Sequence, residues 1–169
     1  MKRSQDLGIS EFLKTGLDLK SHLSQYLKLS SDALEKLLPQ GSDNLASIHP
    51  GALIPEESSA FYEEIVGTAH LIDLGAWHLS SADYIADTLK LQQMFAHGHV
   101  LDFGGGIGTH ALAAASLPQV DHVWFVDLNP ENRKFVSYRA EMLGLNDFIS
   151  CHRDIKDLKR DKFQTLVCL

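Results

Sequence analysis

The amino-acid sequence of 169 residues predicts an α/β fold in which an open parallel sheet of about four strands follows an N-terminal helical segment. Two observations predict it. Before Gly98, apolar residues recur every three or four positions, as they do in amphipathic helices. After Gly98, short apolar runs alternate with segments of helical period, which is typical of right-handed βαβ units. We therefore divide the chain into a helical extension, residues 1–97, and a sheet domain, residues 98–169.

The extension is expected to hold four helical stretches. Apolar residues keep one helical spacing over residues 9–27, and a short second helix over 31–38 begins at a serine cap and stops before Pro39. Glycine, proline and short polar residues predict a loop over residues 40–55. A third helix over 56–74 should turn Phe61, Ile65, Ala69 and Ile72 inward, and a fourth follows Ser80 or Ser81 and ends at Gly98.

Four apolar runs predict the strands of the sheet domain, at residues 99–103, 122–126, 147–152 and 163–169. An Ala- and Leu-rich helix over 107–117 separates the first two strands. The next helix has the usual start signals, because Asn129 suits the cap position and Pro130 the first turn. Gly144 should end that helix.

The first predicted strand leads into a glycine-rich turn, Asp102-Phe-Gly104-Gly105-Gly106-Ile-Gly108, and a helix follows at once. Ligands of open parallel sheets bind at the carboxyl ends of the strands, so this turn predicts a nucleotide-like cofactor. The dinucleotide fingerprint G-x-G-x-x-G, begun at Gly104, fails because its third glycine falls on Thr109. Asp127 ends the second strand, where a carboxylate can accept hydrogen bonds from both ribose hydroxyls of an adenosine.

The spacing D-x-G-x-G-x-G resembles the first motif of the Rossmann-like class I S-adenosylmethionine-dependent methyltransferases, and the resemblance covers about residues 98–169. It implies S-adenosylmethionine as cofactor, with Gly104, Gly105, Gly106 and Gly108 holding its methionine part. Asp102 would interact with the ammonium group of that methionine, directly or through water. Asp127 would bind the ribose, and Leu128 would pack on the adenine.

His152-Arg-Asp154-Ile155 resembles the third motif of the same family. There, Asp154 would bind the adenine amino group and Ile155 would line the adenine face. Asp157 lies close by, and from the sequence either aspartate could instead be a solvated loop residue. The resemblance implies in-line transfer of the sulfonium methyl group to an acceptor, most simply a small molecule, with the N-terminal helices as a lid.

The chain departs from the family because it stops at Leu169, where a full methyltransferase domain continues. We expect an N-terminal fragment of such a domain, and no residue stands out as a catalytic base. The fourth strand would then be an apolar sheet edge, which predicts a homodimer or another assembly. Two alternatives stay open: a non-catalytic, degenerate methyltransferase module that binds a partner, and an NAD-dependent dehydrogenase, which the broken fingerprint disfavours.

Composition limits the classes of partner, metal site and cellular location that we expect. The formal net charge is −7 and no run of Lys or Arg stands out, which argues against a nucleic-acid partner. The nine histidines lack the spacing of metal ligands, so we expect no metal site. Neither a signal peptide nor a membrane-spanning run is visible, and Cys151 and Cys168 form no disulfide framework, so we expect a cytoplasmic protein.

Three residues of the helical extension, Trp77, His78 and Tyr84, allow two interpretations. In many small-molecule methyltransferases the corresponding helical segment covers the cofactor, and these side chains would then line a substrate pocket. Aromatic residues at helical spacing are more often part of a core, and we expect the core here.

Overall fold

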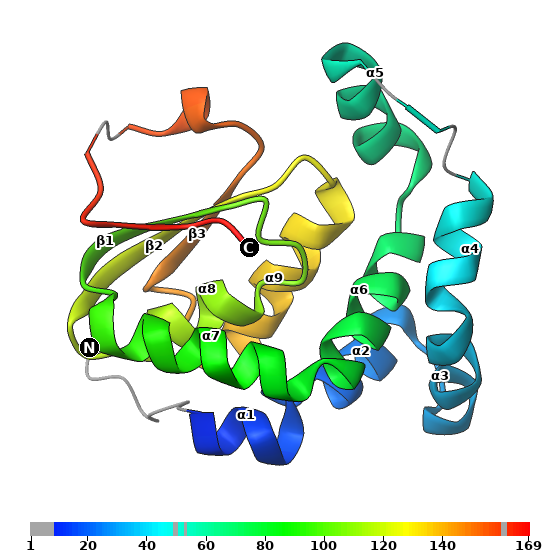
Figure 1. Ribbon diagram of the computed structural model, residues 1–169, viewed down its shortest axis with the longest axis horizontal. Coiled ribbons are helices and arrows are strands. Elements are labelled where there is room, and N and C mark those ends of the chain that lie inside the picture. The colour runs from blue at the N-terminus through cyan, green and yellow to red at the C-terminus, as the bar shows by residue number, and fades with distance from the viewer. Residues whose placement is uncertain (1–8, 49–50, 53, 160–161) are drawn as a thin grey trace.

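A computed structural model describes residues 9–48, 51–52, 54–159 and 162–169. The helical extension contains α1 (Ile9–Thr15), α2 (Leu19–Leu27), α3 (Ser31–Leu37), the 3₁₀-helix η1 (Leu38–Gln40), α4 (Gly41–Ile48), α5 (Pro55–Ala60), the π-helix η2 (Phe61–Ile65), α6 (Ala69–Ser80) and α7 (Ala82–Phe95). Figure 1 shows α3, α4 and α5 as an arm beside the sheet, whereas α7 lies directly against the sheet domain. Within the described residues, no helix is long and apolar enough to cross a bilayer.

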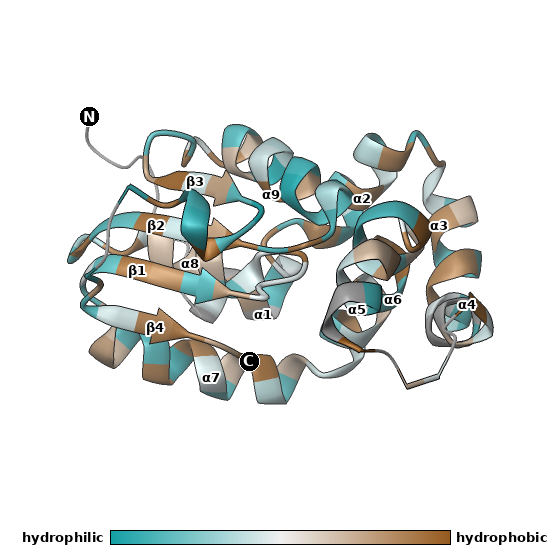
Figure 2. Ribbon diagram, turned by 90° about the horizontal axis from the view of Figure 1, so that it is seen from above, coloured by the Kyte–Doolittle hydropathy of each residue, from teal (hydrophilic) through white to brown (hydrophobic). Residues whose placement is uncertain are grey.

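The fold is α/β, as predicted. Its sheet has four parallel strands in the order β3-β2-β1-β4 (Figure 2). The strands are β1 (Gly98–Phe103), β2 (Val120–Val126), β3 (Ile149–His152) and β4 (Thr165–Val167), and the last two are shorter than predicted. Helix α8 (Thr109–Ser116) connects β1 to β2, and α9 (Pro130–Met142) connects β2 to β3. Asn129 caps α9 by accepting a hydrogen bond from the Glu131 N–H at 2.8 Å, as its sequence position predicts.

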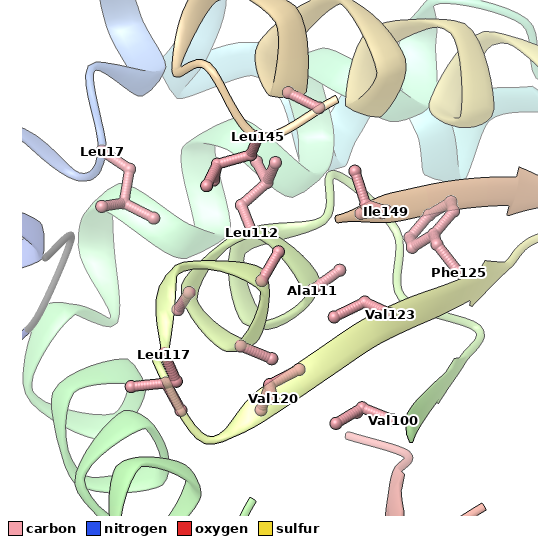
Figure 3. Close-up of a cluster of buried hydrophobic side chains, with 14 of the residues drawn as sticks. Leu17, Val100, Ala111, Leu112, Leu117, Val120, Val123, Phe125, Leu145 and Ile149 are labelled. Atoms are coloured by element: carbon pink, nitrogen blue, oxygen red, sulfur yellow. The ribbon is translucent and has the colours of Figure 1, made fainter. Parts of the chain in front are cut away.

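Helices α7, α8 and α9 lie on one face of the sheet (Figure 1). All eight residues of α8 are buried, so this helix forms the centre of the core between the strands and α7. Val100 of β1 and Val123 of β2 pack with Leu112 of α8 in one apolar cluster (Figure 3). Leu17 of the extension belongs to the same cluster, so the extension and the sheet share a core.

The predicted helix over residues 9–27 is wrong in its middle. Gly16, Leu17 and Asp18 all have positive φ, between 55° and 60°, and they separate α1 from α2. Arg139 of α9 explains the turn, because its guanidinium donates hydrogen bonds to the carbonyls of Gly16 and Leu17 at 3.3 and 3.0 Å. A contact 122 residues away thus overrides the local helical pattern.

The predicted loop over residues 40–55 is also wrong, because α4 occupies much of it. Gly41 is a packing residue rather than a turn residue: a Cβ there would lie 2.9 Å from the Cα of Asp73 in α6. The single helix predicted over 56–74 is divided at Gly67, whose φ is 51°, and α6 then runs on to Ser80. Ile65, expected to face inward, is 62% exposed, and the buried residue just before the break is its neighbour Val66.

Candidate functional site

The turn between β1 and α8 is shaped by close packing as well as by backbone conformation. A Cβ on Gly105 would lie 2.6 Å from both Oδ2 of Asp102 and Cε2 of Phe125. A Cβ on Gly108 would lie 2.5 Å from Cγ2 of Val136, and the φ of this residue is 72°. These two positions therefore require glycine. Gly108 lies at the N-cap of α8 and sets the distance between α8 and α9.

Asp127 follows β2 directly and is tied to the glycine turn. Its Oδ2 accepts a hydrogen bond from the Gly106 N–H at 2.9 Å, and its Oδ1 accepts from the Asn129 N–H at 2.8 Å and the Asn132 side chain at 3.2 Å. A carboxylate has about four acceptor positions, so about one remains, on Oδ2. Burial raises the pKa of Asp127, and these hydrogen bonds act in the opposite direction.

A cavity of about 490 Å³, here called the large cavity, opens beside Asp127. It is lined by Tyr62, His70, Leu74, Phe103, Gly104, Gly106, Val126, Asp127, Leu128, Arg153, Asp154 and Ile155. Six of the nine residues that the sequence suggested as cofactor ligands are therefore brought together here. The volume lies within the usual range for small-molecule sites, roughly 300–1,000 Å³.

Asp154 and Asp157 hold the 3₁₀-helix η3 (Ile155–Asp157) through a pair of reciprocal caps. Asp154 accepts from the Lys156 N–H at 2.9 Å, and Asp157 accepts from the Asp154 N–H at 3.1 Å. Of the two aspartates, only Asp154 lines the large cavity. The structure therefore distinguishes two residues that the sequence alone could not.

A smaller cavity of about 80 Å³, here called the small cavity, shares Leu74, Gly104 and Gly106 with the large cavity. It is lined by Leu74, Trp77, His78, Tyr84, Asp102, Gly104, Gly105, Gly106, His110, Val167 and Leu169. The expectation that Trp77 and Tyr84 belong to a core is wrong, because they are 44% and 52% exposed. They end up beside the glycine turn because α6 and α7 pack against it, which local spacing cannot reveal.

Asp102 is the polar centre of the small cavity. It is only 2% exposed, and its Oδ2 has no hydrogen-bond partner among the described residues. Burial, followed by the charge of Asp127, raises the pKa of Asp102 to about 7. An unpartnered buried carboxylate oxygen is costly, so this atom points to a ligand that donates a hydrogen bond or carries a positive charge.

The sequence motifs did not predict several residues of the site, because these residues come from the helical extension or from inward positions of α9. Tyr62 and His70 form a wall of the large cavity, and His70 is hydrogen-bonded to Asn132 at 3.1 Å. Arg139, fully buried, donates from Nη1 to the Ile107 carbonyl at 3.0 Å and so joins the glycine turn to the α1–α2 turn. The one available signal for Arg139 was a charge at helical spacing from apolar residues, because it lies three residues after Val136 and directly before Ala140.

The sequence matches no protein-family model and no curated protein. Within the described ranges, no group of three or more His, Cys, Asp or Glu side chains is arranged to hold a metal ion. The candidate site consists of two cavities that share residues of the glycine turn, with the buried Asp127 lining the large cavity and the buried Asp102 lining the small one.

Proposed function

We propose that this chain binds S-adenosylmethionine and belongs to a methyltransferase that acts on a small-molecule acceptor. The observation that carries the proposal is the pair of buried carboxylates, one in each of the two cavities that the glycine turn lines. Asp127 keeps about one acceptor position for a ribose hydroxyl in the large cavity, and Asp102 keeps an unpartnered oxygen in the small cavity.

The residues present fit the cofactor. Gly104 lines both cavities, and a Cβ on it would meet no protein atom within 4 Å, so the space above it is open to a ligand. Leu128 and Ile155 supply an apolar lining for an adenine, and Asp154 supplies an acceptor for its amino group. The ammonium group of the methionine part would pair with Asp102, and the bound cofactor supplies an activated methyl group.

Cofactor choice is tested by calorimetric titration of the purified chain with S-adenosylhomocysteine and, separately, with NADH. We expect S-adenosylhomocysteine to bind and NADH not to bind, because Thr109 stands where a dinucleotide site has its third glycine. Binding of NADH alone would overturn the proposal in favour of a dehydrogenase. Binding of neither would favour the degenerate, partner-binding module.

We also propose self-association and a reducing, cytoplasmic location. Strand β4 lies at an edge of the sheet, and Leu166 on it is 65% exposed, so the edge offers both backbone hydrogen bonds and apolar surface to a second copy. Light scattering at working concentration should show a dimer or a larger species, and a monodisperse monomer would contradict this.

The proposed location rests on the cysteines. Cys151 and Cys168 are free thiols, which suits a reducing compartment.

A further inference from the structure

A third cavity, of about 420 Å³ and here called the extension cavity, lies within the helical extension. It forms where α1 packs against α7 and α2 packs against α6 (Figure 1). Its lining consists of Phe12, Lys14, Thr15, Gly16, Asp18, Lys20, Ser21, His78, Leu79 and Ala82. Of these residues only His78 also lines the small cavity, and none lines the large cavity. The volume is that of a small-molecule site, so the extension cavity is a candidate site of its own.

The N-terminus of α2 forms one side of this cavity. Its N-cap residue, Asp18, makes no hydrogen bond from its side chain to the helix, and α2 is nine residues long. The N–H groups of Lys20 and Ser21, in the first turn, have no hydrogen-bond acceptor among the described residues. Free N–H groups at a helix N-terminus carry partial positive charge and favour an anion.

His78 adds a buried polar atom to the lining. It is 7% exposed, and its Nδ1 has no hydrogen-bond partner among the described residues. Burial, followed by the nearby His110 and Arg139, lowers the pKa of His78 to about 3, so its ring is neutral at pH 7 and can donate one hydrogen bond. Buried polar side-chain atoms are normally paired, and an exception is often completed by a ligand or water. A ligand with an acceptor group could complete His78 from the extension cavity.

Arg139 places an uncompensated positive charge behind the wall of the same cavity. Its guanidinium is fully buried and donates to the backbone carbonyls of Gly16, Leu17 and Ile107. Its Nε has no partner, and no carboxylate forms an ion pair with it among the described residues. Burial lowers the pKa of Arg139 to about 9, so it remains charged at pH 7. Buried charges are normally paired, and Gly16 lines the cavity, so an anion bound there would supply the missing counter-charge.

The charged residues of the lining lie at its exposed rim. Lys14 is exposed, and Lys20 is paired with Glu35 at 2.6 Å. Asp18 is the only acidic residue among the described residues of the lining, and it is also exposed. Solvent screens exposed charges, so the repulsion by Asp18 is weaker than the attraction by the buried Arg139. The field inside the cavity therefore favours a negative charge.

The rest of the lining is apolar. Phe12, Leu79 and Ala82 supply this surface, so a ligand that fills the cavity has a small apolar body as well as an anionic group. We propose that the extension cavity binds a small organic carboxylate, whose oxygens accept hydrogen bonds from the N-terminus of α2 and from His78. The proposal does not rest on the methyltransferase function, because the cofactor cavities lie elsewhere.

Benzoate is a suitable probe, and benzyl alcohol is its neutral counterpart of similar shape. In calorimetric titrations at pH 7, benzoate should bind about tenfold or more tightly than benzyl alcohol, the range expected for hydrogen bonds to a charged group. Inorganic phosphate, which lacks the apolar body, should bind more weakly than benzoate. Equal affinities for benzoate and benzyl alcohol would overturn the proposal. Phosphate binding as tight as that of benzoate would mean an adventitious ion only and would overturn it too.

NMR spectra locate the bound probe. Benzoate should shift the amide signal of Ser21 and the ring signals of His78. Gly105 lines only the small cavity, and Leu128 lines only the large cavity, so both amide signals should stay unchanged. A response of Gly105 or Leu128 without a response of Ser21 would place the probe beside the glycine turn and overturn the extension site.

Charge variants at the rim test the electrostatic part. Asp18→Asn removes the acidic charge and suits the backbone, because asparagine tolerates the positive φ of 56° found here. It should raise the affinity for benzoate about two- to fivefold, and Lys14→Gln should lower it by a similar factor. Lys36→Gln removes an exposed charge of α3 outside the lining and is the matched control, with an affinity close to that of the wild type. Wild-type affinity in both rim variants would contradict the proposal.

His78→Phe tests the hydrogen bond from the imidazole. The variant keeps a ring but has no nitrogen, so benzoate should bind about three- to tenfold more weakly. Affinity for benzyl alcohol should change less. Unchanged benzoate affinity in a folded His78→Phe variant would remove His78 from the site. If this buried substitution prevents folding, the rim variants and the Ser21 signal still decide the proposal.

Discussion

Asp102 and Asp127 occupy similar places at neighbouring strands, yet their surroundings differ sharply. Both are buried beside the same glycine turn, at 2% and 8% exposure. Asp127 accepts three hydrogen bonds from the protein, whereas Oδ2 of Asp102 has no partner among the described residues. A buried carboxylate that the protein satisfies organises the turn, whereas a buried carboxylate with one oxygen left without a partner lowers stability in favour of binding.

The largest expected effect comes from removing the charge of Asp102. A rise of its pKa from 3.8 to about 7 means that the folded chain loses stability as pH rises through this window. At 1.36 kcal/mol per pKa unit, the loss is about 4 kcal/mol and is complete above pH 7. Asp102→Asn should abolish it, so the wild-type stability should fall relative to the variant between pH 4 and pH 7. Urea unfolding across this range measures the difference.

The informative quantity is the difference in unfolding free energy between the wild type and Asp102→Asn. The buried histidines make stability rise with pH, which is opposite to the effect of Asp102. The lowered pKa values of His78 and His110 give stability that is present above pH 6.5 and is lost as pH falls. The same histidines are present in both proteins, so their effect cancels. The exposed Asp121, replaced by Asn, is a matched control that should track the wild type. Parallel profiles for wild type and Asp102→Asn would show that Asp102 is satisfied in the folded chain.

Asp127→Ala should have the next largest effect, and it should be a loss of stability at neutral pH. The substitution leaves the N–H groups of Gly106 and Asn129 without their acceptor in a buried environment. We expect a loss of about 2–4 kcal/mol in the free energy of unfolding, together with loss of S-adenosylhomocysteine binding. Asp121→Ala, an exposed carboxylate at the start of the same strand, should change stability by less than about 0.5 kcal/mol. A variant as stable as the control would mean that Asp127 does not organise the turn.

The two aspartates also show which features of the fold and the candidate site can be predicted from the sequence. The alternation of short apolar runs with helical segments after Gly98 was enough to predict the parallel sheet, and six of the nine suggested cofactor residues line one cavity. Such features are local, because a strand end and its turn are set by neighbouring residues. The hydrogen bond from Gly106 to Asp127 joins residues 21 apart, and only the folded chain reveals it.

The helical extension was predicted less well, for a physical reason. Its helices are short and are stabilised by packing, so distant contacts decide where they begin and end. Arg139 imposes the turn at Gly16 and Leu17, and Gly41 serves the approach of α4 to α6 instead of a loop. The same packing brings Trp77 to the small cavity, which no local period could show.

The smallest expected effect separates Asp154 from Asp157. Each accepts one backbone hydrogen bond in the same 3₁₀ turn, at 2.9 and 3.1 Å, so Asp154→Ala and Asp157→Ala should lose similar, small amounts of stability. Only Asp154 lines the large cavity. Its loss should weaken S-adenosylhomocysteine binding by a further factor of about three to ten, equivalent to roughly 0.5–1.5 kcal/mol for one hydrogen bond. Calorimetric titration of both variants measures this factor. Equal affinities would mean that Asp154 acts through the turn alone, and that the adenine is held by its apolar contacts with Leu128 and Ile155 rather than by its amino group.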